Sequence, residues 1–353
     1  MSRNAQTKVP ATRQSQTPAA MGQPFPARFF DSMTAYKKSA ALKAAIELDL
    51  FTVLSESSQT PESLALRLQA SVRGARILCD FLTVEGFLTK QNGRYSATPD
   101  STLFLNRKSP AYIGSAAFFM GSPMLMENFR DLAGCVRKGG TVSTESMLAP
   151  EHPIWVEFAR SMAPLAAMDA ELIAGLLRAD NKQDWKVLDI AAGHGMYGIA
   201  LARHNPKAEI VAVDWKNTLV VARENADKAG ISSRYRTIEG SAFDVDFGKG
   251  YDIVLLTNFL HHFDAETNES LLRKVLRALK PGGSAGALEF VPNEDRLTPP
   301  IPAEFSLMML AGTAAGDAYT FTELERMFGK ARFRSVELHD IFPSPQRVVI
   351  GRK

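Results

Sequence analysis

The sequence is poor in cysteine, in long apolar runs and in unbalanced charge. Its two cysteines, Cys79 and Cys135, are too few for a disulfide scaffold and lack the spacing of a metal site, so we expect a reduced, cytoplasmic setting and no metal. No run approaches the roughly 18 apolar residues of a membrane span, and the N-terminus lacks the apolar core of a signal peptide. The net charge of +3 is too small to imply a nucleic-acid partner.

The composition is otherwise that of a soluble globular protein. Hydrophobic residues make up 45% of the chain and charged residues 22%. With 353 residues, the chain is long enough for two domains with cores of their own. Residues 1–27 are an exception, because they are polar and contain Arg3, Lys8 and Arg13 without any acidic residue. Such a segment buries too little apolar area to offset the entropy lost on ordering. We therefore expect a disordered tail rather than a basic nucleic-acid arm.

Residues 28–105 are expected to form a helical domain that ends in a hairpin. Small and apolar residues at helical spacing predict one helix that runs to Leu54. A helix over 74–85 is followed by two short strand patterns around the turn 91–93. This order suggests a winged helix, in which Arg73 and Arg76 would face DNA. Because the same helix is mostly apolar, we favour a dimerisation domain over a DNA-binding one.

Residues 106–182 are predicted to be a mostly helical connector. Three stretches have apolar residues at helical spacing, namely 111–119, 123–137 and 155–177. In the last stretch, Trp155, Phe158 and Met162 lie about one turn apart on one face. Such a stripe is most often part of a core. Its place just before the next domain means that it could equally cover a substrate cavity.

Residues 183–353 begin with the pattern of a nucleotide-binding βαβ unit. A strand over 187–190 leads into a turn with Gly193 and Gly195, a helix over 196–204 follows, and a second strand ends on Asp214. Glycines let the backbone approach a ligand closely, and an acid at the end of the second strand can accept hydrogen bonds from both ribose hydroxyls.

The turn also has the letters of a dinucleotide site, G-x-G-x-x-G, but Asp189 argues against one. This residue lies four positions before the first glycine, where its carboxylate would repel a pyrophosphate. It suits a cationic ligand or a bound ammonium group. The pattern therefore disfavours a nicotinamide dinucleotide.

Further strands alternate with helices, which predicts an α/β fold with a parallel sheet, helices on both faces and an antiparallel hairpin at the end. The remaining expected strands are 235–238, 251–257, 285–290, 335–339 and 346–351. Ligands of such sheets lie outside the carboxyl ends of the strands. The candidate cofactor residues are those at or after these ends: Asp189, Gly193, Gly195, Asp214, Trp215, Ser241, Ala242, Phe243 and Asn258.

The same edge of the sheet is expected to collect His261, His262 and Glu289. A histidine oriented by a carboxylate is suited to removing a proton from a phenol or enol. The resulting anion is a far better nucleophile than the neutral hydroxyl group. One of the two histidines can be purely structural.

From Phe29 to the C-terminus the chain resembles the plant caffeate and animal hydroxyindole O-methyltransferases, and in particular their bacterial members. The resemblance is carried by the segments VLDIAAGHG, VAVDW, NFLHHF, ALKPGG and LEF. It implies a Rossmann-like, seven-stranded methyltransferase sheet after a winged-helix dimerisation domain. It also implies S-adenosylmethionine (SAM) as cofactor, S-adenosylhomocysteine as product, a homodimer, and a small aromatic acceptor that is methylated at oxygen.

The resemblance further implies roles for single residues. His261 would be the general base and Glu289 would orient it. Asp214 would bind the ribose, and Asp189 with the two glycines would surround the methionyl end. Phe158, Met162 and Met309 match positions that line the family's acceptor cavity, and His262, next to the base, is a further candidate for binding the acceptor.

Three positions depart from the pattern of that family. His262 replaces the acid after the base, Ser241 replaces the acid that helps to hold the adenine, and Ala318 lies where a second glutamate would flank the base. Because related carbon methyltransferases need no strong base, methylation at carbon is an alternative. A winged-helix regulator with a ligand-sensing domain is a second alternative, and a nicotinamide enzyme is a third.

Overall fold

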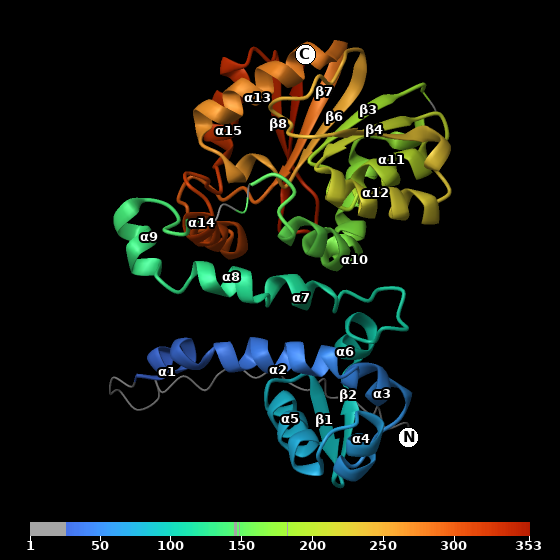
Figure 1. Cartoon of the computed structure of the whole chain (residues 1–353), viewed down its shortest axis with the longest axis vertical. Coiled ribbons are helices and arrows are strands. Elements are labelled where there is room, and N and C mark those ends of the chain that lie inside the picture. Colours follow the sequence, from blue (N-terminus) through green and yellow to red (C-terminus); the bar gives the residue numbers. More distant parts are fainter. Residues whose placement is uncertain (1–25, 145–146, 148, 182) are drawn as a thin grey trace, which may run out of the picture.

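The computed structural model describes residues 26–144, 147, 149–181 and 183–353. A helical unit at the N-terminal end and a larger unit around a central sheet lie at opposite ends of the molecule (Figure 1). Between them run the short helices α7 (Ala116–Met120), α8 (Pro123–Asn128) and α9 (Leu132–Lys138). The tail expected over 1–27 lies outside the described residues except for its last two. No helix of the described part is long and apolar enough to span a membrane.

The N-terminal unit packs helices against a two-stranded hairpin. Its elements are α1 (Ala27–Thr34), α2 (Tyr36–Glu47), α3 (Leu50–Glu56), α4 (Pro61–Arg67), α5 (Val72–Val84), β1 (Leu88–Gln91), β2 (Arg94–Ala97) and α6 (Pro99–Phe104). The turn of the hairpin is Asn92-Gly93, with φ of 49° and 74°, as a two-residue turn between twisted strands requires. The single helix expected to reach Leu54 is wrong, because Asp49 adopts a left-handed φ of 57° and separates α2 from α3.

The connector is helical, but its boundaries differ from those predicted. The helix expected over 123–137 is two helices, because Asp131 accepts a hydrogen bond from the Gly134 amide at 2.9 Å and caps a new helix, α9. The helix expected from residue 111 begins only at Ala116. The long helix α10 (Ile154–Leu176) agrees with the prediction to one residue at each end.

The central sheet has seven strands in the order β5-β4-β3-β6-β7-β9-β8. The strands are β3 (Lys186–Ile190), β4 (Glu209–Asp214), β5 (Tyr235–Glu239), β6 (Tyr251–Thr257), β7 (Leu279–Glu289), β8 (Ser335–Asp340) and β9 (Arg347–Arg352). The first five are parallel, and the terminal hairpin of β8 and β9 adds antiparallel pairing at one edge, as predicted. Strand β7 begins earlier than expected, because Leu279 already pairs with Tyr251.

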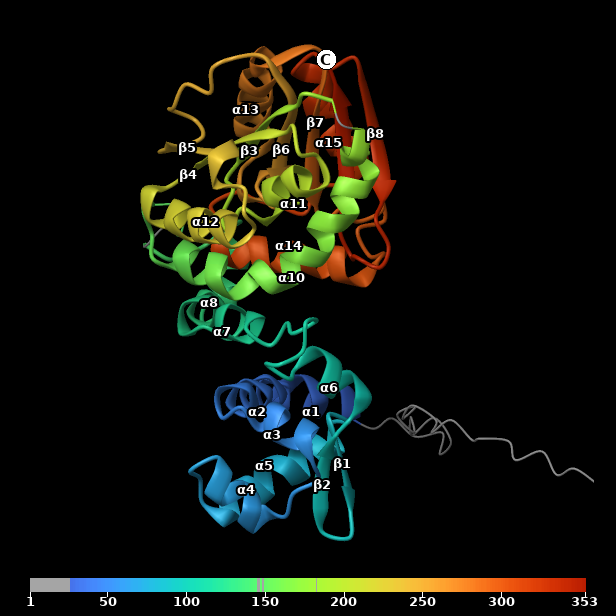
Figure 2. The same ribbon diagram turned by 90° about the vertical axis from the view of Figure 1, so that its right-hand side faces the viewer.

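Helices cover both faces of this sheet (Figures 1 and 2). One face packs against α10, α11 (Met196–His204) and α12 (Lys216–Lys228), and the other against α13 (Ala265–Ala278) and α15 (Phe321–Lys330). Val187 and Leu188 are consecutive in β3, yet they belong to opposite cores, as the alternation of a strand requires. The sequence did not predict α14 (Pro300–Gly312), whose prolines lie in its first turn, where helices tolerate them.

Candidate active site

The glycine turn after β3 brings backbone to the carboxyl edge of the sheet. Gly193 and Gly195 have φ of 55° and 75°, a region that side-chain-bearing residues rarely adopt. A Cβ atom at Gly195 would lie 2.6 Å from the Tyr235 hydroxyl oxygen. Between the glycines, His194 is buried and its Nδ1 accepts a hydrogen bond from the Met196 amide at 3.2 Å. Burial lowers the pKa of His194 to about 4, so this imidazole is uncharged, and its ring packs against Phe158 and Tyr197.

Asp189 is a fully buried carboxyl group directly below this turn. One oxygen, Oδ2, accepts a hydrogen bond from the Gly198 amide at 3.1 Å, and the other has no partner among the described residues. Burial raises the pKa of Asp189 to about 7. A buried carboxyl oxygen without a partner is costly. The position therefore fits a ligand with a positively charged or hydrogen-bond-donating group.

Asp214 lies at the end of β4, beside the same turn. It accepts hydrogen bonds from the backbone amides of Gly193 at 2.8 Å and Trp215 at 2.7 Å. Although the residue as a whole is only half-buried, burial of its carboxyl group raises the pKa to about 6. The glycine turn and this acid are thus held together as one unit.

The loop after β5 contributes the next candidate residues, Ser241, Ala242 and Phe243. Ser241 Oγ accepts a hydrogen bond from the Phe243 amide at 3.2 Å. The Phe243 ring packs edge-on against Phe263, with centroids 4.9 Å apart. Asn258, after β6, has both ends of its side chain bonded within the protein: Nδ2 donates to the Tyr197 hydroxyl at 3.3 Å, and Oδ1 accepts from Gln346.

His261 and Glu289 form a buried pair, with 2.5 Å between Nδ1 and Oε2. His261 lies in the turn η4 (Leu260–His262), which follows β6, and Glu289 ends the neighbouring strand β7. The second oxygen of Glu289 accepts hydrogen bonds from the backbone amides of Phe259 at 3.0 Å and Leu260 at 2.8 Å. The carboxylate is therefore fixed by the same turn that carries the histidine. With its Nδ1–H donated to Glu289, His261 has Nε2 free to accept a proton.

Aromatic rings surround this pair. Phe305 of α14 lies edge-on to His261 at 4.9 Å between centroids and stacks on Phe290 at 4.1 Å. On the other side, Trp155 of α10 lies edge-on to His262 at 5.4 Å. Burial and the neighbouring His261 hold the pKa of His262 well below its usual value, and its Nδ1 has no partner within the described ranges. His262 is thus a neutral group in an aromatic setting.

The residues expected to line the acceptor cavity lie on two helices. Phe158 of α10 stacks on His194 with centroids 5.9 Å apart, and its ring is 3.6 Å from the position of a Cβ atom at Gly193. Met162 is half-buried one turn later, and Met309 is buried on α14. Phe290 and Phe305 were not among the site residues predicted from the sequence. Phe290 could have been predicted, because it directly follows Glu289 at the end of a strand. Phe305 could not, because it belongs to α14, which was not predicted.

At the position where a second glutamate would flank the base, the chain has Ala318, and the residues beside it make other contacts. Ala318 is fully buried, and its neighbour Asp317 forms an ion pair with Arg296 at 3.2 Å. Tyr319 donates a hydrogen bond from its hydroxyl group to the Phe263 carbonyl at 2.6 Å. Glu289 is thus the carboxylate that this arrangement gives to His261. No cluster of potential metal ligands occurs in the described part of the chain.

Comparison with known proteins adds two matches to family models. A model described as an O-methyltransferase dimerisation domain matches residues 30–107. A model described as a methyltransferase domain matches residues 187–283. The first match begins within α1 and runs through the hairpin and α6, and the second covers the strands that lead to the glycine turn, Asp214 and His261.

Relatives extend over nearly the whole chain. A solved structure from Nostoc punctiforme, assigned as an O-methyltransferase, is 51% identical, covers 94% of this chain and all of its own, and superposes with a TM-score of 0.90. The 3-hydroxy-5-methyl-1-naphthoate 3-O-methyltransferase of Streptomyces sahachiroi is 28% identical over 93% of this chain and 95% of that protein. Human N-acetylserotonin methyltransferase in complex with SAM has the same fold, with a TM-score of 0.80 at 22% identity over 97% of this chain and 99% of that one.

Proposed function

This chain belongs to the family of SAM-dependent O-methyltransferases with an N-terminal dimerisation domain, and we propose that it methylates a hydroxyl group of a small aromatic acceptor with His261 as general base. The observation that carries the proposal is the buried pair of His261 and Glu289 at the carboxyl edge of the sheet. The sulfonium methyl group of SAM reacts readily with an oxyanion but poorly with a neutral hydroxyl group. A base at this edge supplies the oxyanion.

Glu289 is proposed to act through His261. Its carboxylate accepts the Nδ1–H, which fixes the tautomer with a free Nε2, and its negative charge stabilises the imidazolium that forms when Nε2 takes the acceptor's proton. Because the two backbone amides at Oε1 hold the carboxylate in place, the imidazole is oriented before the acceptor arrives. Orientation of this kind lowers the entropic part of the barrier.

The cofactor would be held along the carboxyl edge. Asp214 would accept hydrogen bonds from the ribose hydroxyls, and the glycine turn with Asp189 would bind the methionyl end, where the unpaired Asp189 oxygen fits an ammonium group. Trp215, Ser241, Ala242 and Phe243 would enclose the adenosine end, and Asn258 would support the turn from below through Tyr197. When bound, SAM supplies an electrophilic methyl group whose transfer leaves the neutral sulfide S-adenosylhomocysteine.

The acceptor is proposed to be small, flat and apolar apart from its hydroxyl group. Trp155 and Phe305 pack against the two histidines, and Phe158 packs against Trp155. Met162 and Met309 are proposed to complete this apolar lining. His262 is neutral there, so it would contact the acceptor by a hydrogen bond rather than by charge. The connector, residues 106–182, would contribute to the acceptor cavity through α10.

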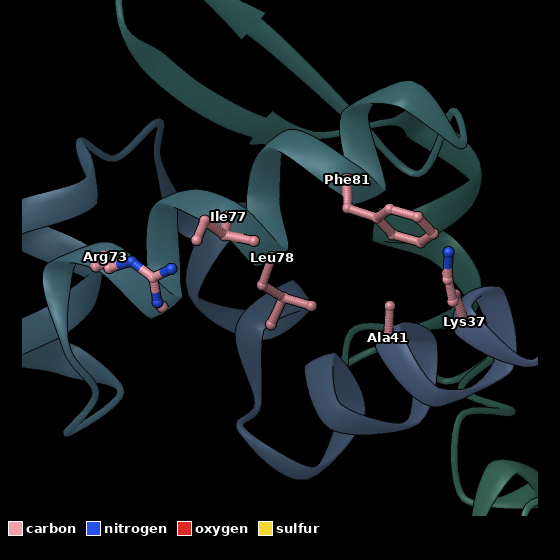
Figure 3. Close-up of a pocket in the computed structure, with 7 residues that line it drawn as sticks. Lys37, Ala41, Arg73, Ile77, Leu78 and Phe81 are labelled. Atoms are coloured by element: carbon pink, nitrogen blue, oxygen red, sulfur yellow. The ribbon is translucent and has the colours of Figure 1, made fainter.

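We further propose a cytoplasmic homodimer formed through the N-terminal unit. Supporting this, α2 and α5 enclose an apolar groove of about 410 Å³, lined by Ala41, Ile77, Leu78 and Phe81 with Lys37 and Arg73 at its ends (Figure 3). The adjacent helix α1 exposes Phe29 and Met33, each 61% accessible. The regulator hypothesis is not favoured, because α5, the helix that would read DNA, presents apolar residues to solvent and its Arg76 is paired with Asp80.

The proposal is tested by replacing His261 with asparagine and measuring methylation of a panel of hydroxynaphthalenes. Loss of a general base should lower turnover by about 10²–10⁴-fold, while the dissociation constant for S-adenosylhomocysteine stays as in the wild type. His204→Asn is a matched control, because His204 also pairs with a glutamate, Glu171 at 2.6 Å, but on the surface. Undiminished turnover of His261→Asn would remove the base and favour a carbon acceptor or catalysis by proximity alone.

A further inference from the structure

Lys274 places an ammonium group against the loop that follows β5. It lies on α13, and its Nζ donates hydrogen bonds to the carbonyl oxygens of Ala242 and Phe243, both at 2.9 Å. The same nitrogen lies 4.2 Å from the centroid of the Phe247 ring. One side chain from another element therefore holds two consecutive backbone carbonyls of this loop and contacts a ring four residues further along it. The group is partly buried, and this desolvation lowers the pKa of Lys274.

This anchoring of the loop backbone matters because the loop lacks the acidic residue that helps to hold the adenine in the family it resembles. Ser241 occupies that place, and its Oγ is engaged by the Phe243 amide. The two acids that the loop does contain, Asp244 and Asp246, are exposed. Recognition of a base at this loop therefore relies on backbone groups and the Ser241 hydroxyl, and their positions depend on how firmly the loop backbone is held.

We propose that Lys274 is a positioning residue for the adenosine end of the cofactor, acting by fixing the backbone of Ala242 and Phe243 at the carboxyl edge of the sheet. This inference rests on the proposed placement of adenosine against residues 241–243. An ammonium group with two carbonyl partners makes charge-assisted hydrogen bonds, which are stronger than neutral ones. Without them the loop would have to be ordered when the ligand binds, and that ordering cost would appear as weaker affinity.

The chain contains a matched control for this role. Lys353 Nζ also donates to two carbonyl oxygens, those of Leu276 at 2.7 Å and Leu279 at 2.5 Å. These carbonyls lie at the end of α13 and the start of β7, which is the amino edge of the parallel strands. Lys274→Met and Lys353→Met thus remove the same kind of contact at opposite edges of the sheet.

The test measures binding of S-adenosylhomocysteine and of 5′-methylthioadenosine by calorimetry. The second compound keeps the base and ribose but has no amino-acid end, so it reports on the adenosine site alone. Lys274→Met should raise both dissociation constants by about ten-fold, as expected for lost hydrogen bonds to a charged group, with kcat at saturating SAM and the KM of the acceptor unchanged. Lys353→Met should leave both dissociation constants as in the wild type, and Lys274→Arg should recover most of the affinity.

Other results would overturn the inference in distinct ways. Wild-type dissociation constants in folded Lys274→Met contradict it, and an equal loss in Lys353→Met shows a general effect of destabilisation instead. If Lys274→Met does not fold, Lys274→Gln takes its place, and unchanged affinity there contradicts it equally. Asp214→Asn separates this inference from the proposed site: weaker binding in Asp214→Asn alone would refute the role of Lys274 but keep the site. Unchanged binding in both would refute the placement of the cofactor itself.

Discussion

Asp189 and Asp214 are acidic residues whose carboxyl groups are buried, and neither has a cationic partner among the described residues. Burial raises their pKa to about 7 and about 6, so folding favours their protonated forms. A group with a raised pKa stabilises the fold below its unfolded pKa, and that contribution is lost as the pH rises through the folded value. The window for Asp189 therefore runs from about pH 4 to about pH 7. Binding of a cation beside these groups would offset the cost of ionising them.

Asp189→Asn is accordingly predicted to separate stability from binding. In the absence of ligand at pH 8, the variant should unfold about 5 °C above the wild type, because it removes a buried ionised group. At pH 5, where the wild-type group is protonated, the two should unfold at similar temperatures. The affinity for SAM at pH 8 should fall. Thermal unfolding and calorimetry at the two pH values check this, and a variant less stable than the wild type at pH 8 would contradict it.

The site residues that could be predicted are those whose place follows from the ends of strands. His261 and Glu289 are 28 positions apart, but they end or follow neighbouring parallel strands, so their meeting was predictable. Lys274 and Phe305 were not, because each reaches the site from a helix whose packing angle the sequence does not state. Which buried polar atoms lack a hydrogen-bond partner, such as Asp189 Oδ1, also depends on packing, so these atoms could be found only in the structure.

Among the helices and strands, those with strong apolar periodicity and clear turn residues at their ends were predicted with accurate bounds. Strand β6 was predicted to the residue, and α10 to one residue at each end despite Pro164 in its interior. Errors arose where one local side chain decided the outcome. Asp49 breaks a helix by its left-handed backbone, Asp131 starts one by capping, and the prolines of α14 concealed a helix that begins with them.

Helix α10 connects the two halves of the proposed site. Its first half carries Trp155 and Phe158 over the histidines and the glycine turn. On the outer side, Arg160 binds Glu224 of α12 through two hydrogen bonds of 2.8 and 3.1 Å. A single helix thus contacts both the glycine turn and the proposed acceptor side. The apolar stripe on this helix can therefore be part of the core and line the proposed cavity at the same time.

At the scale of the whole molecule, the family model for a dimerisation domain coincides with the unit that exposes apolar helices. Burial of such a surface against a second copy is favourable by the hydrophobic effect. The chain is therefore predicted to be dimeric in solution, and a charge in the groove between α2 and α5 should weaken the dimer.

Ile77→Glu should shift the chain towards monomer in sedimentation equilibrium, with the catalytic unit still folded. The matched control is Val220→Glu on α12, since Val220 is 42% and Ile77 43% accessible and the two substitutions add the same charge. A dimer that Ile77→Glu leaves intact, or that Val220→Glu dissociates equally, would contradict the assignment of this surface.

In the proposed mechanism, His261 removes a proton from a hydroxyl group before the methyl group is transferred. It is tested most directly by comparing wild type and His261→Asn on two acceptors of similar shape at pH 8: 2-naphthol, which is largely un-ionised, and a nitro-naphthol that is already ionised. Loss of the base should lower the rate with 2-naphthol by about 10²-fold or more and leave the rate with the ionised acceptor nearly unchanged. An equal loss with both acceptors would show that His261 positions the acceptor and does not act as the base.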